Sequence, residues 1–171
     1  MSDEPKFLVD SDVLITAKNS YYAFDFCPGF WEAVLNGYTD HRVGSIDRIR
    51  NELLNGTPGD PLVKWVEETV PGDFFYSSTE PEVVRVFESI MLWVQQHPQY
   101  SDPAKAKFAS GADGWLVAYA KVHEEMLVTL EQPAPESKNS IKIPDACNQF
   151  GVQTRTPYSM LRSLSVKLTL A

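Results

Sequence analysis

Short apolar runs alternate with longer segments of helical periodicity along this chain, and the alternation restricts its fold more than any other feature. An apolar run of a few residues bounded by turn signals is typical of a buried strand. A regular exchange of strand and helix favours a parallel sheet with helices on both faces. We therefore predict a three-layer α/β/α sandwich around a central parallel sheet of about five strands. The expected strands are Phe7–Val9, His41–Gly44, Phe74–Tyr76, Met126–Thr129 and Val152–Thr154.

Apolar residues recur at three- and four-residue spacing between these strands, which predicts helices. Three local expectations are specific enough to test. Ser45 should cap a helix running from Ile46 to Leu54, Leu62–Val70 should be one helix, and Ile141–Ile143 should extend the sheet. The remaining expected helices are Val13–Lys18, Phe30–Asn36, Glu80–Gln96, Ser101–Ser110, Gly114–Val122, Pro144–Phe150 and one that begins at Pro157.

Length and composition indicate one globular domain over residues 1–171. The 43% hydrophobic and 22% charged content is ordinary for such a domain. No apolar segment approaches the roughly 20 residues that cross a bilayer, and the acidic start Met1–Pro5 is unlike a signal peptide. We therefore expect a cytoplasmic protein without a membrane partner. Cys27 and Cys147 stand among apolar or small residues and are expected to be free thiols.

The formal net charge of −8 disfavours a broad electrostatic surface for nucleic acid. The same charge suits a cluster of carboxylates that binds a cation. Five basic side chains lie near the acidic candidates in sequence and could guide a phosphate backbone, although each could equally be a solvated surface charge. They are Arg48, Arg50, Lys105, Lys107 and Lys121.

Two carboxylates, Asp10 and Asp12, directly follow the first expected strand. Ligands of open α/β sheets bind in the crevice outside the carboxyl ends of the strands, which is where these side chains should stand. An alternative is that they only end the strand and cap the next helix. Further acids at comparable places in the chain favour a site over a simple cap.

Three more acids fall at such places. Glu52 lies at the border of the apolar stripe of its helix, where a surface ion pair with Arg48 is the alternative role. Asp113 opens a helix whose apolar face packs on the sheet, where N-capping is the alternative. Glu131 follows the fourth strand and repeats the position of Asp10 in the chain.

A divalent cation would relieve the repulsion in such a cluster, because neighbouring carboxylates raise one another's pKa. Oxygen ligands without histidine or cysteine favour Mg²⁺ or Mn²⁺. Carboxylate-held ions of this kind activate water and stabilise the oxygens of a phosphodiester during its displacement. The pattern therefore predicts metal-assisted phosphodiester hydrolysis.

The chain resembles the PIN-domain ribonucleases, the group that includes the VapC-type toxins of toxin–antitoxin pairs. This resemblance implies that Asp10, Glu52, Asp113 and Glu131 hold the metal and that Thr129 supports the site by hydrogen bonding. It also implies an RNA substrate, a protein antitoxin that blocks the acidic pocket, and a tendency to form homodimers. The matching segments are Leu8–Asp12, Ser45–Leu53, Ala112–Ala120 and Leu127–Glu131.

The sequence departs from the family at two site positions. Asp12 stands where the family commonly has a small hydroxyl or amide residue, and it adds negative charge as a further possible ligand. Glu131 stands where the family commonly has aspartate, so its longer side chain could coordinate through water or not at all. Asp145 could contribute another carboxylate, although an exposed helix start explains it equally well.

Two rival functions fit parts of the pattern. A haloacid-dehalogenase-like phosphatase also opens with a strand and an Asp-x-Asp pair, in which Asp10 would be the nucleophile. The later lysine and aspartate pair that such an enzyme needs has no convincing match in this chain. The second rival is a PIN-like module that has kept its acids but only binds a partner.

Overall fold

The computed structural model describes residues 3–170, and five parallel strands form its centre in the order β3-β2-β1-β4-β5. This arrangement confirms the predicted fold class. The first strand lies in the middle of the sheet because both β2 and β4 pair with it. The strands are β1 (Phe7–Val9), β2 (Val43–Ile46), β3 (Phe75–Tyr76), β4 (Met126–Val128) and β5 (Thr154–Arg155).

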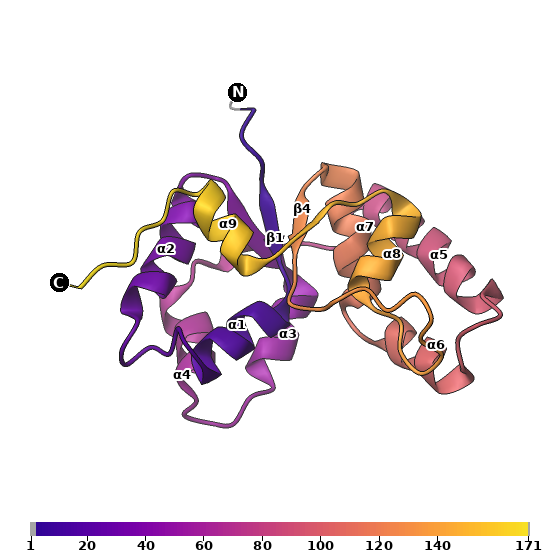
Figure 1. The fold of residues 1–171 in the computed structure, drawn as a ribbon, viewed down its shortest axis with the longest axis horizontal. Helices are drawn as coiled ribbons and strands as arrows, with labels where there is room; N and C mark the ends of the chain where they lie inside the picture. Colours follow the sequence, from indigo (N-terminus) through magenta and orange to yellow (C-terminus); the bar gives the residue numbers. More distant parts are fainter. Residues whose placement is uncertain (1–2, 171) are drawn as a thin grey trace.

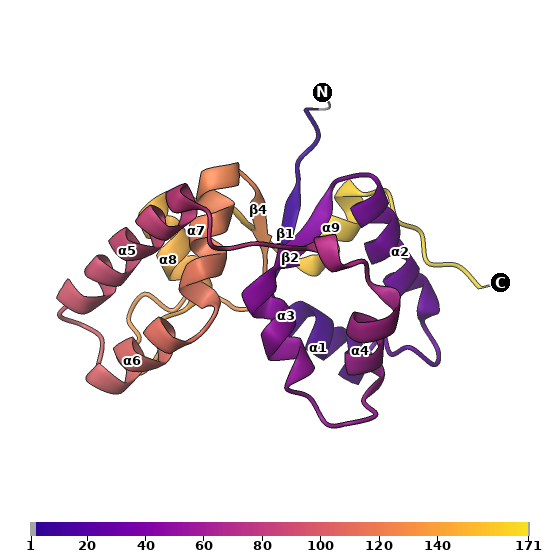
Figure 2. The ribbon, with the colours of Figure 1, turned by 180° about the vertical axis from the view of Figure 1, so that it is seen from behind.

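Helices cover both faces of this sheet. In Figure 1, α1, α2, α4 and α9 lie on one side of β1 and β4, while α5, α6, α7 and α8 lie on the other; Figure 2 shows the same two groups from behind. None of the helices among residues 3–170 combines the length and apolar character needed to cross a membrane. The helices are α1 (Ser11–Asn19), α2 (Pro28–Thr39), α3 (Asp47–Leu54), α4 (Pro61–Lys64), α5 (Pro81–Gln96), α6 (Asp102–Ser110), α7 (Asp113–His123), α8 (Ile143–Phe150) and α9 (Pro157–Ser163).

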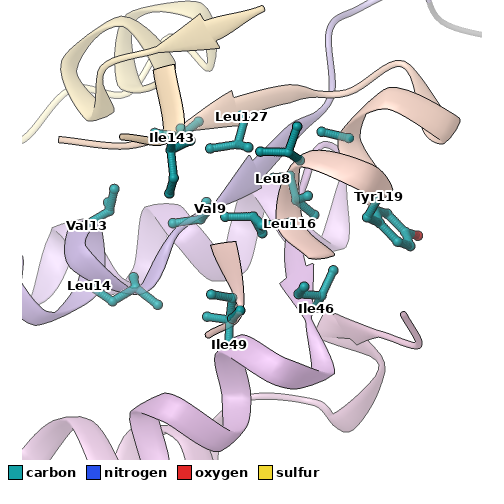
Figure 3. Packing of buried hydrophobic residues seen from close by; sticks show 14 of the residues in the cluster. Leu8, Val9, Val13, Leu14, Ile46, Ile49, Leu116, Tyr119, Leu127 and Ile143 are labelled. Carbon is teal, nitrogen blue, oxygen red and sulfur yellow. The ribbon is translucent and has the colours of Figure 1, made fainter. Parts of the chain in front are cut away.

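The core surrounds β1, whose three side chains are fully buried. Val9 lies between Leu116 of α7 and the α1 side chains Val13 and Leu14, and Leu8 and Leu127 of β4 belong to the same core (Figure 3). Removing this apolar area from water stabilises the fold by about 25 cal/mol per Å². Since β1 is held on both faces and on both edges, the residue that follows it, Asp10, has a fixed position.

Two of the three local expectations were wrong. Ser45 lies inside β2 and α3 begins at Asp47, because the Ser45 hydroxyl donates to the Val9 carbonyl at 2.6 Å instead of capping a helix. Ile143 begins α8, so residues 141–143 do not extend the sheet. The expected helix over 62–70 does form: α4 continues without a break into a π-helical turn, Trp65–Thr69. A 3-10 turn, Gly72–Phe74, also shortens the third strand.

Candidate functional site

Asp10 lies at the carboxyl end of β1 with only 3% of its surface exposed. Its Oδ1 accepts from the backbone N–H of Ser11 at 2.7 Å, so Asp10 caps α1, and its Oδ2 accepts from the Thr129 hydroxyl at 3.1 Å. Burial, followed by repulsion from Asp12 and Asp113, holds the pKa of Asp10 well above its usual value, while Thr129 acts in the opposite direction. Asp10 therefore both caps α1 and belongs to the acidic cluster.

Asp12 turns from the first turn of α1 toward the end of β4. Its carboxylate accepts from the backbone N–H of Leu130 at 3.1 Å and lies 3.2 Å from the Thr129 hydroxyl. That hydroxyl also accepts the backbone N–H of Glu131 at 3.1 Å. Thr129 thus connects Asp10, Asp12 and the residue after β4, which is consistent with the supporting role expected of it.

Glu52 reaches the same region from α3. Its Oε2 accepts from the Ser11 hydroxyl at 2.8 Å, and its Oε1 accepts from the backbone N–H of Ala112 at 3.4 Å, at the start of α7. The ion pair with Arg48 that its position in the helix also allowed does not form. Arg48 instead donates to Ser78 at 3.0 Å and places its guanidinium 3.9 Å from the centre of the Trp115 ring.

Asp113 is the first residue of α7. Burial, followed by repulsion from Glu131, Glu52 and Asp12, raises the pKa of Asp113 to about 7, while Lys107 acts in the opposite direction. Ala112 occupies the N-cap position of α7, and its methyl side chain offers no capping hydrogen bond. Asp113 is therefore not the N-cap that its place in the sequence also allowed. The repulsion shows that the fold brings Asp113 into electrostatic contact with acids from three other segments.

Glu131 lies just beyond β4, and one of its carboxylate oxygens is engaged in a structural hydrogen bond. Its Oε2 accepts from the backbone N–H of Ile143 at 2.7 Å, which satisfies a free donor at the start of α8. Glu131 lines two cavities, one of about 350 Å³ that it shares with Glu52 and Asp113, and one of about 130 Å³ that it shares with Thr129 and Arg155. The carboxylate therefore stands between two openings.

The larger of these two cavities is lined by three of the acids that the sequence predicted, whereas Asp10 and Asp12 do not line it. Glu52, Asp113 and Glu131 line it together with two lysines, Lys107 and Lys142. An even larger cavity of about 670 Å³ lies between α2 and residues 164–170, but none of the predicted site residues lines it. We therefore place the candidate site at the carboxyl edge of the sheet, where the acids converge.

The chemistry of these acids fits Mg²⁺ or Mn²⁺, since they offer only oxygen ligands and a cation would relieve the repulsion between them. The carboxylates do not lie close enough together to act as a set of metal ligands. Within residues 3–170, no three His, Cys, Asp or Glu side chains are grouped so that they could hold a metal ion. Glu52 and Glu131 are turned toward Ser11 and the Ile143 N–H. Coordination by all of the acids would require their carboxylates to move closer together.

Asp145, the possible further carboxylate, lines neither of the two cavities at the acids. Asp145 is half-buried in the first turn of α8 and accepts from the Ala134 N–H at 2.9 Å, so it fixes the preceding loop. Sequence reasoning missed Ser11, although its place between two aspartates was a usable signal. It also missed Lys142, for which no local signal exists because only the fold brings the loop before α8 to the acids.

Comparisons with known proteins agree with this architecture. The model of a family described as "Domain of unknown function (DUF4411)" matches residues 7–168. The search of curated proteins found no match. A solved structure, that of FitAB bound to an IR36 DNA fragment, contains a chain with 18% sequence identity and a TM-score of 0.52, over 89% of this chain and 95% of that one. This similarity confirms the expected PIN-like fold.

Proposed function

Because the chain belongs to the DUF4411 family, whose description states no activity, and has a PIN-like fold, we propose from its site that it is a metal-dependent endoribonuclease. The reaction would be hydrolysis of RNA phosphodiester bonds with Mg²⁺ or Mn²⁺. The observation that carries the proposal is the convergence of carboxylates from four segments of the chain at one edge of a parallel sheet.

Asp10 and Asp113 are the principal ligands in this proposal, and Glu52 joins them from α3. Glu131 and Asp12 complete the set, directly or through water. A bound divalent ion would neutralise these carboxylates, activate a water molecule and stabilise the oxygens of the displaced phosphodiester. The remaining contributions come from the chain itself: Thr129 orients Asp10, and Ser11 orients Glu52.

The phosphatase alternative is disfavoured by the rest of the sequence. Such an enzyme needs a later lysine and aspartate pair, for which this chain has no convincing match. Trapping a phosphoenzyme on Asp10 would favour that alternative. The other rival, a PIN-like module that only binds a partner, predicts a folded protein without nuclease activity.

The resemblance to PIN-domain toxins supports three further parts of the proposal. We propose that the protein is the toxin of a toxin–antitoxin pair, and that its partner is an antitoxin whose bound segment blocks the acidic site. A homodimer is proposed on the same basis. Light scattering of the purified protein at increasing concentration measures the dimer, and growth arrest upon expression that depends on Asp10 tests the toxin role.

Cleavage of structured RNAs by protein freed from copurifying partners tests the enzymatic proposal. We expect cleavage with Mg²⁺ or Mn²⁺, none with a chelator, and none from Asp10→Asn or Asp113→Asn, although both variants should remain folded by circular dichroism. Asp25→Asn is the matched control, because Asp25 is exposed and lies outside both cavities at the acids. Cleavage that persists in the two site variants would refute the assignment.

A further inference from the structure

The cavity of about 350 Å³ beside the acids has positive charge on two of its walls. Lys107 reaches it from α6, and Lys142 reaches it from the loop that precedes α8. Within residues 3–170, neither ammonium group forms an ion pair or a side-chain hydrogen bond. Two lysines therefore border a cavity of carboxylates without being paired to any of them.

Other basic side chains near the site are already occupied by the fold. Lys105 donates to the Gln95 carbonyl at 3.0 Å, and Lys121 donates to the Phe150 carbonyl at 2.7 Å. Arg48 is held between Ser78 and the face of Trp115. Of the five basic candidates in the sequence, only Lys107 lines the cavity. The structure thus separates lysines that stabilise the fold from lysines that remain available to a ligand.

The wall that carries Lys142 is fixed by hydrogen bonds to neighbouring elements. The Lys138 carbonyl accepts from the Ser101 N–H at 2.8 Å, and the Gln99 side-chain amide donates to two loop carbonyls, each at 2.6 Å. Asp145 holds the start of the loop through Ala134. Since these contacts restrain the loop on both of its sides, the cavity is formed before any ligand arrives.

We propose that this cavity binds the nucleotide next to the scissile phosphodiester, with Lys107 and Lys142 contacting its phosphate. The inference rests on the proposed function, because it takes the scissile phosphate to lie at the acids. The phosphate of a nucleotide beside the carboxylates would meet any negative charge that the metal leaves uncompensated, and an ammonium group on the cavity wall offsets that charge. The cavity volume of about 350 Å³ lies near the lower end of the range for small-ligand sites, which suits one nucleotide. The substrate is therefore a single strand at this point.

Binding of a fluorescein-labelled single-stranded RNA tests the inference separately from cleavage. Fluorescence anisotropy is measured in the Asp113→Asn background over a series of salt concentrations. Loss of one charged contact corresponds to about tenfold weaker binding for Lys107→Ala or Lys142→Ala. Each substitution should also lower the slope of log K against log salt by about 0.7, the value for one phosphate contact on a single strand. A Lys→Arg change at either position should restore most of the affinity and slope.

Lys105→Ala and Lys121→Ala are the matched controls, because both lysines point to backbone carbonyls and neither lines the cavity. We expect wild-type affinity and slope from them, with thermal melts confirming that all four variants are folded. If Lys107→Ala and Lys142→Ala bind like the controls while the wild-type protein still cleaves RNA, the subsite is refuted and the nuclease proposal stands. If the RNA binds normally but the wild type does not cleave it, the nuclease proposal fails instead. RNA that no variant binds would overturn both.

Discussion

The hydroxyl of Ser11 donates a 2.8 Å hydrogen bond to the carboxylate of Glu52, which lies 41 residues later in the chain. The backbone N–H of Ser11 donates to Asp10 at 2.7 Å. One residue at the start of α1 therefore holds two acids that come from different elements. This relationship explains why Glu52 points into the site rather than toward Arg48.

Ser11→Ala should lower RNA cleavage about fivefold, the equivalent of roughly 1 kcal/mol for one lost hydrogen bond. The physical reason is that Glu52 would keep only its longer contact with the Ala112 N–H. Single-turnover cleavage rates measure the effect. Ser20→Ala is the control, because the Ser20 hydroxyl lies at the other end of α1, where it donates to the Thr16 carbonyl on the surface. Equal rates for the two variants would contradict the role of Ser11.

Thr129→Val should reduce cleavage and move its pH dependence to higher pH. The Thr129 hydroxyl donates to Asp10 and lowers its pKa, so removing that hydroxyl raises the pKa of an already protonation-prone carboxyl. A pH profile of kcat/KM measures the shift. Thr129→Ser keeps the hydroxyl and should retain the wild-type profile. A Val variant whose profile coincides with that of the Ser variant would exclude this role.

Asp113→Asn should stabilise the metal-free protein at about pH 8 by on the order of 4 kcal/mol. The pKa of Asp113 in the folded protein is raised to about 7. The native state therefore binds this proton more tightly than the unfolded state, and the wild type loses stability as pH rises from about 4 through about 7. Urea unfolding at about pH 8 and about pH 4 measures the difference. The gain should vanish at the lower pH, and a variant that is less stable at the higher pH would be contrary evidence.

Mg²⁺ or Mn²⁺ should raise the melting temperature of the wild type, because an ion that binds only the folded state stabilises it by about 2.7 kcal/mol at a hundred times its Kd. Asp10→Asn and Asp113→Asn should show little of this rise, whereas Asp25→Asn should show all of it. Differential scanning fluorimetry with and without a chelator measures the shifts. Equal shifts in all of these variants would mean that the ion binds elsewhere.

Ser45→Ala should destabilise the protein by about 1–2 kcal/mol, since it leaves the buried Val9 carbonyl without its hydroxyl donor. Ser45 is completely buried, so water cannot replace the lost bond. Chemical denaturation measures the change. Ser89→Ala removes an exposed hydroxyl that donates to the Arg85 carbonyl in α5, and it should cost much less. A similar loss in both variants would argue against the role given to Ser45.

Local patterns in the sequence determined the elements and the identity of the acids. The run ending at Asp10 was apolar enough to specify a buried central strand. Asp113 and Glu131 stood at a helix start and after a strand, and Glu52 stood at the border of an apolar helix stripe. Periodicity reports which side of an element is buried, because side-chain direction repeats every 2 residues in a strand and every 3.6 in a helix. The parallel sandwich therefore followed from the order of the segments.

Only the tertiary structure decided how those acids are held and what stands opposite them. Ser45 was expected to cap a helix but bonds to β1, and Lys142 lies beside the acids although it is far from most of them in the chain. Such contacts depend on which strands become neighbours and on how a loop is anchored. They arise from hydrogen bonds between distant segments, whereas a sequence pattern records only the preferences of residues within a few positions of one another.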